Sequence, residues 1–399
     1  MKSIKTVFKS GFGPSSSHTV GPSIACKLIS RRYPDRDKVI VTLFGSLSLT
    51  GKGHGTDKAI KTVLPEAEVV FDNSKLISEL PHPNTMSFQI YKNNKLLDEL
   101  TVMSIGGGEI KILGEEYNPR EVYKENTFSD IIKVCKKEGI TLPEYIYQRE
   151  DDDFKDDLRL KWKTMKECIN RGLNSEGVLP GKLKLTRKAK FLHNMVVENE
   201  GPTTKEDRII SSYAFAVSEE NADGNLIVVA PTCGSAGVLP AVLYYMEHNA
   251  HYKEEDIIDG LAVAGLIGNI IRTNASLSGA ECGCQAEIGS ACSMAAGAKA
   301  QINKMKLEQI EYAAEVSMEH HLGLTCDPVM GYVQIPCIER NAVAAMRAMN
   351  AVNLARFLYL NRRISFDAVV ETMYKTGCDL SDKYRETSTG GLASLYNNN

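Results

Sequence analysis

The sequence predicts an α+β fold, in which a small N-terminal α/β domain precedes a larger, mainly all-α domain. β-rich runs bounded by turn residues, such as Val39–Phe44 and Thr85–Tyr91, occur in the first part of the chain. After Lys155, apolar residues recur at the 3.6-residue spacing of helices almost throughout. Because 399 residues suffice for two domains, we expect the first at 1–150 and the second at 151–399.

Local signals predict further elements of the N-terminal domain. Ser23–Arg31 has helical spacing, and Pro22 lies near its start, where proline is tolerated. Glu109–Leu113 alternates like a strand and follows the turn Gly106–Gly108. The acidic run that begins at Glu150 is typical of a solvated linker, and we place the domain boundary close to it.

Helices are expected to build the second domain, with one short strand at Leu226–Val229. The most apolar stretch, Leu261–Ile271, is too short to cross a membrane and predicts a buried helix. A helix at 128–138 is expected near the end of the first domain. Helical spacing in the second domain is found at 155–171, 205–220, 236–250, 256–273, 306–320, 341–360 and 366–376.

The overall composition argues against several classes of protein. Hydrophobic residues make up 43% and charged residues 24%, which is ordinary for a globular protein. The formal net charge of −3 implies no basic face, so nucleic acid is not expected as a partner. No apolar run follows the charged start Met1–Lys5, so we expect no signal peptide. The sequence therefore predicts a cytoplasmic protein without a membrane partner.

One polar loop, Gly13–Thr19, combines Ser15, Ser16 and Ser17 with His18 just before the first predicted helix. A helix N-terminus presents free N–H groups and partial positive charge, which suit a carboxylate. The alternative is a capped polar turn without a ligand.

A second loop, Leu49–Asp57, is rich in glycine and contains Thr50, Lys52 and His54. It lacks the spacing of a phosphate-binding P-loop. A lone histidine is more often structural than catalytic, but two histidines in two such loops of one small domain favour a functional site. The loop would supply an imidazole with an ammonium group nearby.

Ten cysteines are unevenly distributed, and disulfides between them are not expected in a reducing compartment. Their spacing matches neither a zinc ribbon nor a ferredoxin. They are either small core residues or, in part, metal ligands. Seven lie in the second half: Cys233, Cys282, Cys284, Cys292, Cys326, Cys337 and Cys378.

Eight segments in order along the chain resemble the iron–sulfur L-serine dehydratase family in its fused, single-chain form. They extend over nearly the whole chain, and several are ten residues or longer, which makes the match specific. They are GPSSSHTVGP (13–22), GSLSLTGKGHGTD (45–57), SIGGG (104–108), EGVLPG (176–181), APTCGSAGVLPA (230–241), NASLSGAECGCQAEIGSACSMAA (274–296), MEHHLGLTCDPVMGYVQIPCIERNA (318–342) and KYRETSTGGLA (383–393).

The resemblance implies a [4Fe–4S] cluster on Cys284, Cys326 and Cys337, whereas Cys282 and Cys292 flank the first ligand without binding. Three thiolates leave one iron open, and that iron can act as a Lewis acid on the serine hydroxyl. Such a cluster predicts sensitivity to oxygen.

The resemblance also implies the deamination of L-serine to pyruvate and ammonia. It points to His54 as the general base and His18 as a second catalytic group. The substrate site would be lined by Ser15, Ser16, Ser17, Thr50 and Lys52. A homo-oligomer in the form of a dimer is expected.

Two departures from the family pattern matter. No cysteine follows KYRETSTGGLA, so occlusion of the open iron by a tail cysteine is not expected. The chain is also short between Leu64 and Thr85, which argues against a separate regulatory serine site. The competing functions are a pyridoxal-phosphate dehydratase, a cysteine desulfidase, a non-enzymatic sensor of iron or amino acid, and a zinc-bound structural module.

Overall fold

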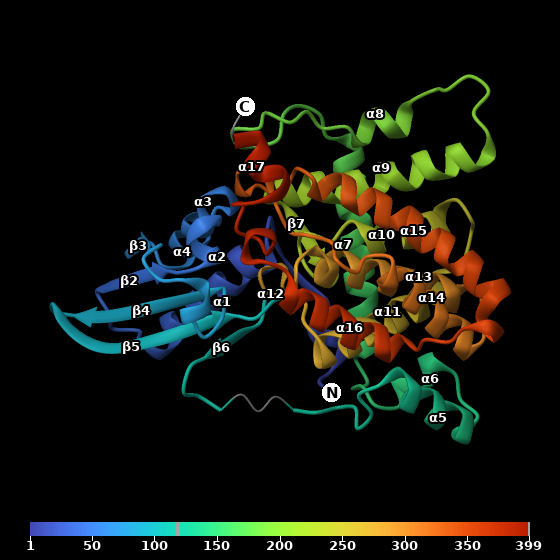
Figure 1. The fold of residues 1–399 in the computed structure, drawn as a ribbon, viewed down its shortest axis with the longest axis horizontal. Coiled ribbons are helices and arrows are strands. Elements are labelled where there is room, and N and C mark those ends of the chain that lie inside the picture. Colours follow the sequence, from blue (N-terminus) through green and yellow to red (C-terminus); the bar gives the residue numbers. More distant parts are fainter. Residues whose placement is uncertain (117–119, 398–399) are drawn as a thin grey trace.

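The sheet and most of the helices occupy different parts of the molecule (Figure 1). A computed structural model of the chain describes residues 1–116 and 120–397. Within them, five strands form one sheet on one side, and the long helices pack together on the other. This arrangement confirms the predicted α+β fold class.

The sheet has the strand order β3-β2-β4-β5-β6. Strands β2 and β3 are parallel, and the other neighbours are antiparallel. Along β2, Val39, Val41 and Leu43 are buried while the residues between them are not, so one face of the strand packs on the core. The strands are β2 Lys38–Leu43, β3 Ala67–Phe71, β4 Thr85–Lys92, β5 Lys95–Ser104 and β6 Ile110–Ile112.

Two helices, α1 (Gly21–Arg32) and α4 (Thr56–Val63), pack on this sheet and complete its core. Ile29 of α1 and Ile60 of α4 are fully buried in the same cluster as the apolar side chains of β2 and β4. We call the sheet with these helices the sheet part, and the packed long helices the helical body.

The helical body is built around α11 (Glu254–Asn274) and α13 (Ser290–Ile302), which contact each other along their length. Every residue of α13 is buried, so this helix has no polar face and no amphipathic pattern. The surrounding helices are α7 Phe154–Asn174, α9 Pro202–Ala222, α10 Val238–His248, α14 Leu307–Glu319, α15 Cys337–Leu358 and α16 Phe366–Asp379.

The start of the chain packs on the helical body rather than on the sheet. Strand β1 (Lys9–Phe12) pairs antiparallel with β7 (Leu226–Val229). Helices α5 (Phe128–Glu138) and α6 (Leu142–Tyr147) also contribute to the core of the helical body. The division at residue 150 stays a prediction, and we propose from this packing that the sheet part comprises roughly 13–113 alone.

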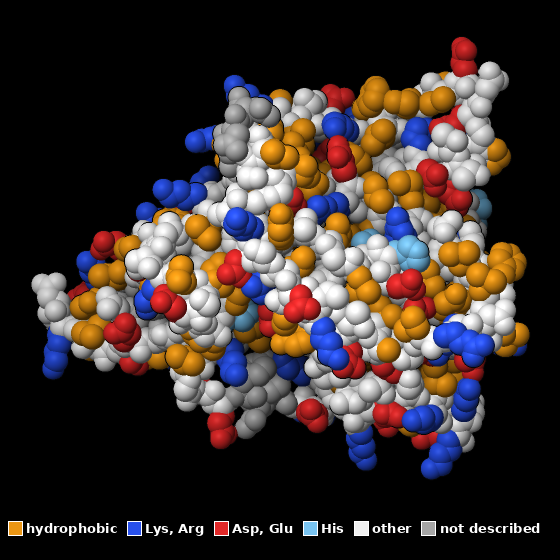
Figure 2. Space-filling model, viewed as in Figure 1, with side chains coloured by type: hydrophobic (Ala, Val, Ile, Leu, Met, Phe, Trp, Pro, Cys, Tyr) orange, Lys and Arg blue, Asp and Glu red, His pale blue; other side chains and the backbone are white. Residues whose placement is uncertain are grey.

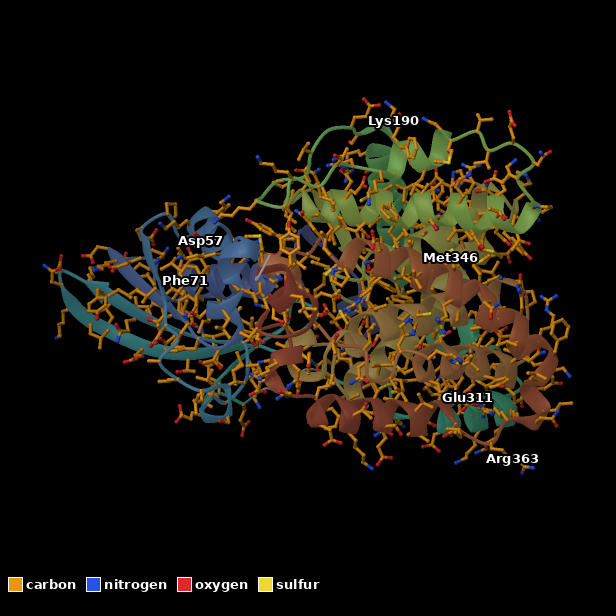
Figure 3. All side chains as sticks on the ribbon, turned by 45° about the horizontal axis from the view of Figure 1, so that its top comes forward. Asp57, Phe71, Lys190, Glu311, Met346 and Arg363 are labelled. Carbon is orange, nitrogen blue, oxygen red and sulfur yellow. The ribbon has the colours of Figure 1, made fainter. Side chains whose placement is uncertain are left out.

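Side chains of both charges are mixed over the face shown in Figure 2, without sorting by sign. Figure 3 shows Asp57 and Phe71 in the sheet part, and Met346 and Glu311 in the helical body. Among the described residues, no helix combines the length and the apolar character needed to cross a bilayer.

Candidate active site

The two predicted loops of the sheet part are short helices in the structure. Residues 16–20 form a single π-helical turn, η2 (Ser16–Val20), which Ser15 caps by accepting a hydrogen bond from the His18 N–H at 3.1 Å. The second loop folds into α2 (Ser46–Leu49), α3 (Gly51–His54) and the start of α4. These turns bring His18 and His54 together as stacked rings, with centroids 4.2 Å apart and planes 20° apart.

The hydrogen bonds of His18 define its tautomer. Its Nε2 lies 2.9 Å from the Thr50 hydroxyl and 3.1 Å from the Ser46 carbonyl oxygen. The Thr50 hydroxyl donates its own hydrogen to that same carbonyl at 2.9 Å, so both neighbours offer only lone pairs to the ring. Nε2 therefore carries the hydrogen, and the free lone pair of the neutral ring is on Nδ1, 3.4 Å from the Ser15 hydroxyl.

The same reasoning applies to His54. Its Nδ1 lies 3.0 Å from the carbonyl oxygen of Thr50, which can only accept, so Nδ1 is the donor. Its Nε2 has no hydrogen-bond partner among the described residues. Burial lowers the pKa of His54 to about 4, so the ring is neutral at pH 7. His54 thus presents an unprotonated nitrogen, as a general base requires.

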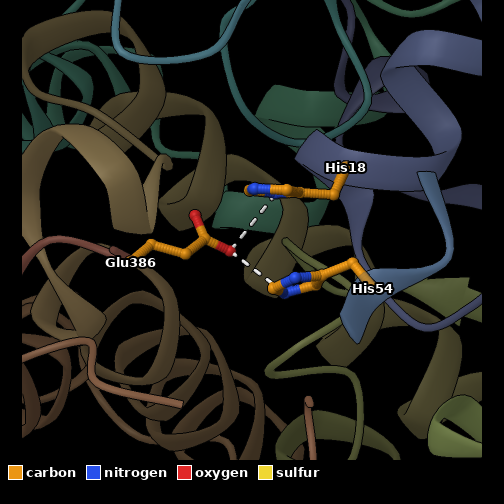
Figure 4. Close-up of side chains that lie close together, drawn as sticks. All are labelled: His18, His54 and Glu386. Atoms are coloured by element: carbon orange, nitrogen blue, oxygen red, sulfur yellow. Dashed lines mark ion pairs between the residues drawn. The ribbon is translucent and has the colours of Figure 1, made fainter. Parts of the chain in front are cut away.

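Glu386 joins the two histidines and was not identified from the sequence (Figure 4). Its Oε1 lies 3.5 Å from His18 Nδ1 and 3.6 Å from His54 Nε2. Burial raises the pKa of this carboxyl well above its usual range, so its neutral form is favoured. A neutral carboxyl has one hydrogen, so it can donate to the lone pair of either imidazole but not to both at once.

The backbone of Glu386 is held in an unusual conformation. Its φ of 58° lies in the left-handed region, which side chains other than glycine adopt rarely. Its N–H donates to the carbonyl oxygen of Cys326 at 2.8 Å, and its own carbonyl accepts from the Ser46 hydroxyl at 2.7 Å. The C-terminal segment is therefore fixed between the two parts. The clue available in the sequence was an acidic residue among threonines, serines and glycines.

The three cysteines predicted as ligands line one small cavity of about 20 Å³ together with side chains from the sheet part. Cys284 precedes the π-helical turn η4 (Gln285–Gly289), Cys326 follows α14, and Cys337 begins α15. All three are buried. The other lining residues are Ser15, His54, Gly234, Glu287, Ile288, Pro328, Val333 and Glu386.

The three thiols differ in their protonation. A hydrogen bond with Cys284 and burial raise the pKa of Cys326, and burial raises the pKa of Cys337, so both favour the neutral thiol. The ligand atoms of Cys284, Cys326 and Glu287 all lie within 4.8 Å of one another. A hydrogen bond with Cys326 and the charge of the half-buried Arg340 guanidinium lower the pKa of Cys284 to about 6. The thiolate is the form that binds metal. Three thiols, one of which favours the thiolate, fit a thiol-ligated metal group, and the half-buried Glu287 is a further acid that the sequence reasoning missed.

The other residues singled out from the sequence lie at various places around this cavity. Ser16 and Ser17 are buried in η2 and do not line it, and Lys52 is exposed and does not line it either. Cys282 is packed against Gly377 of α16, and Cys292 donates to the Ala344 carbonyl. These contacts support the assignment of Cys284 over its two neighbours, which remains a prediction.

The fold and the site together define a two-part site, in which the sheet part supplies imidazoles and the helical body supplies thiols. Residues 3–71 match the family model "Serine dehydratase beta chain", and residues 68–393 match "Serine dehydratase alpha chain". The chain therefore belongs to the serine dehydratase family, with both regions in one polypeptide.

Curated relatives resemble the chain from end to end. L-serine dehydratase 2 of Escherichia coli (strain K12) is 40% identical over 448 aligned positions, which cover 98% of each chain. The L-serine dehydratase of Streptomyces coelicolor is 38% identical, again over 98% of each chain. That of Haemophilus influenzae is 40% identical over 98% of this chain and 99% of its own. The alignments are longer than 399 residues, so these relatives have segments that this chain lacks.

Proposed function

We propose that the chain is an L-serine ammonia-lyase, which converts L-serine to pyruvate and ammonia. The names and full-length coverage of the relatives support this activity. The observation that carries the proposal is the position of His54, which has an unprotonated Nε2 and lines the same cavity as Cys284, Cys326 and Cys337. Loss of water from serine needs both a base at the α-carbon and help for the leaving hydroxyl.

The thiols of Cys284, Cys326 and Cys337 would hold a [4Fe–4S] cluster, and a bound cluster with an open iron supplies Lewis-acid chemistry at the hydroxyl. In our proposal, His54 Nε2 removes the α-proton. The Thr50 carbonyl prepares this base, because it holds the hydrogen on Nδ1 and leaves the lone pair on Nε2. A general base of this kind contributes about 10²–10⁴-fold to the rate.

In this proposal, Glu386 and Ser15 orient the imidazole rings and the substrate. Glu386 Oε1 lies within reach of both imidazole nitrogens, so it fixes the two rings relative to each other. Ser15 caps η2 and borders the cavity, where its hydroxyl can contact the substrate. Release of water gives aminoacrylate, which tautomerises to an imine and is hydrolysed to pyruvate and ammonia.

The test is anaerobic purification followed by iron, sulfide and pyruvate measurements. The expected protein absorbs near 400 nm, contains iron and sulfide, and forms pyruvate from L-serine. Cys326→Ala should remove both the iron and the activity, whereas the matched control Cys292→Ala should retain both. A protein without iron that forms pyruvate at full rate would overturn the cofactor assignment. A cytoplasmic location and a homodimer remain predictions from the sequence.

A further inference from the structure

A second, larger cavity of about 630 Å³ adjoins the active site, and we call it the outer chamber. His54 lines both the outer chamber and the small cavity that contains the cysteines, so the two cavities adjoin at this residue. The sheet part contributes α3, α4 and residues near η2, and the helical body contributes the facing wall. That wall includes Pro180, Gly181, Ala222, Asp223, Gly224 and Tyr332.

The two cavities differ in size, and this difference affects where an incoming amino acid can bind first. The inner cavity, of about 20 Å³, is much smaller than the outer chamber. A volume of 630 Å³ lies within the usual range of small-molecule sites. An amino acid can therefore be accommodated first in the outer chamber, directly beside the proposed base.

The charges that line the outer chamber favour an anion. Lys52 of α3 and Lys58 of α4 both line it and are exposed. Within residues 1–116 and 120–397, neither ammonium group has a carboxylate within 4.0 Å; the Lys52 ammonium lies 5.4 Å from the centroid of the Phe71 ring. The one acid in the wall, Asp223, is already paired with Arg187. Two unpaired cations thus face a chamber without a free carboxylate.

We propose that the outer chamber is the route to the active site, and that Lys52 and Lys58 capture the carboxylate of the incoming amino acid before it reaches His54. This inference rests on the proposed function for the identity of the amino acid. Because the ammonium groups recognise the carboxylate alone, other small carboxylates, including the product pyruvate, compete for the chamber. An oriented pair of cations in a cleft also raises the rate of association with an anionic group.

Competitive lysine labelling tests this binding without any need for turnover. The intact protein, purified anaerobically, is treated with an acetylating reagent in the presence of L-lactate, with glycerol as the neutral control. Mass spectrometry then gives the rate at Lys52 and Lys58 relative to Lys61, an exposed lysine of α4 that does not line the chamber. L-lactate should slow acetylation of Lys52 and Lys58 relative to Lys61, and glycerol should not. Equal relative rates with lactate and glycerol would overturn the proposal.

Steady-state kinetics provide the second test. Lys58→Gln should raise KM for L-serine by about two- to fivefold, the effect of one exposed charge pair, and leave kcat unchanged. The increase should disappear at high salt, because salt screens exposed charges. The matched variant Lys61→Gln should have the KM of the parent protein. A KM for Lys58→Gln equal to that of Lys61→Gln would refute carboxylate capture.

The two experiments separate this inference from the proposed function. Protection of Lys52 and Lys58 in a protein that forms no pyruvate would support the chamber and contradict the lyase activity. Pyruvate formation without protection of Lys52 and Lys58 would support the lyase activity and contradict the proposed role of the chamber.

Discussion

The burial of His54 predicts an unusual dependence of activity on pH. A general base works in its unprotonated form, and burial lowers the pKa of His54 from 6.5 to about 4. At pH 5.5, a histidine with a pKa of about 4 is ~97% unprotonated, whereas one with a pKa of 6.5 is ~9% unprotonated. Activity should therefore decrease only as the pH falls through the lowered pKa of His54, and not between pH 7.5 and 5.5.

The assay is the initial rate of pyruvate formation under anaerobic conditions at limiting L-serine, between pH 5 and 8. We expect kcat/KM at pH 5.5 to remain close to its value at pH 7.5. Iron content and recovery of activity on return to pH 7.5 control for damage to the metal site. A reversible tenfold decrease between pH 7.5 and 5.5, with the iron retained, would refute the assignment of a buried neutral His54 as the base.

Three further predictions concern the fold and the ligands. Gly265→Ala should lower the free energy of unfolding, measured with denaturant, by about 1–3 kcal/mol, because the added Cβ would lie 2.1 Å from a side-chain atom of the N-terminal segment. Gly201→Ala is the control and should show no such loss, because no atom lies within 4 Å of its Cβ. Cys284→Ala should abolish iron binding and Cys282→Ala should not, and equal iron contents would contradict the ligand assignment. Glu386→Gln should lower kcat by up to about tenfold, the order expected for one hydrogen bond between neutral groups, while unchanged kcat would exclude a positioning role.

Sequence patterns predicted those strands and helices that have one buried face and one exposed face. Strand β2 alternates, and helices such as α7 carry an apolar stripe, so both were expected near their observed positions. Helix α13 has no such stripe because every residue is buried, and it was not predicted. Strands β3 and β5 were not predicted either. They carry acidic residues on their more exposed positions, and the sheet context determines their conformation.

The site was predicted less completely than the fold. His18 and His54 could be selected because each lies in a polar, glycine-containing segment, and the structure brings their rings together. The choice of three cysteines came from the family resemblance, since their spacing alone was uninformative. Glu386 and Glu287 were missed because a single acidic residue is a weak signal, even where, as at Glu386, it stands among threonines, serines and glycines. Their importance arises only from tertiary packing, which places both side chains in the lining of the cavity that the three thiols also line.

The central claim is that the helical body holds the metal group and the sheet part supplies the base, so the two functions can be separated by one substitution. His54→Gln, purified anaerobically, tests this most directly through its iron content and kcat measured on the same sample. We predict the iron content of the parent protein and a kcat lower by about 10²–10⁴-fold. An iron-loaded His54→Gln protein with the kcat of the parent would contradict the account.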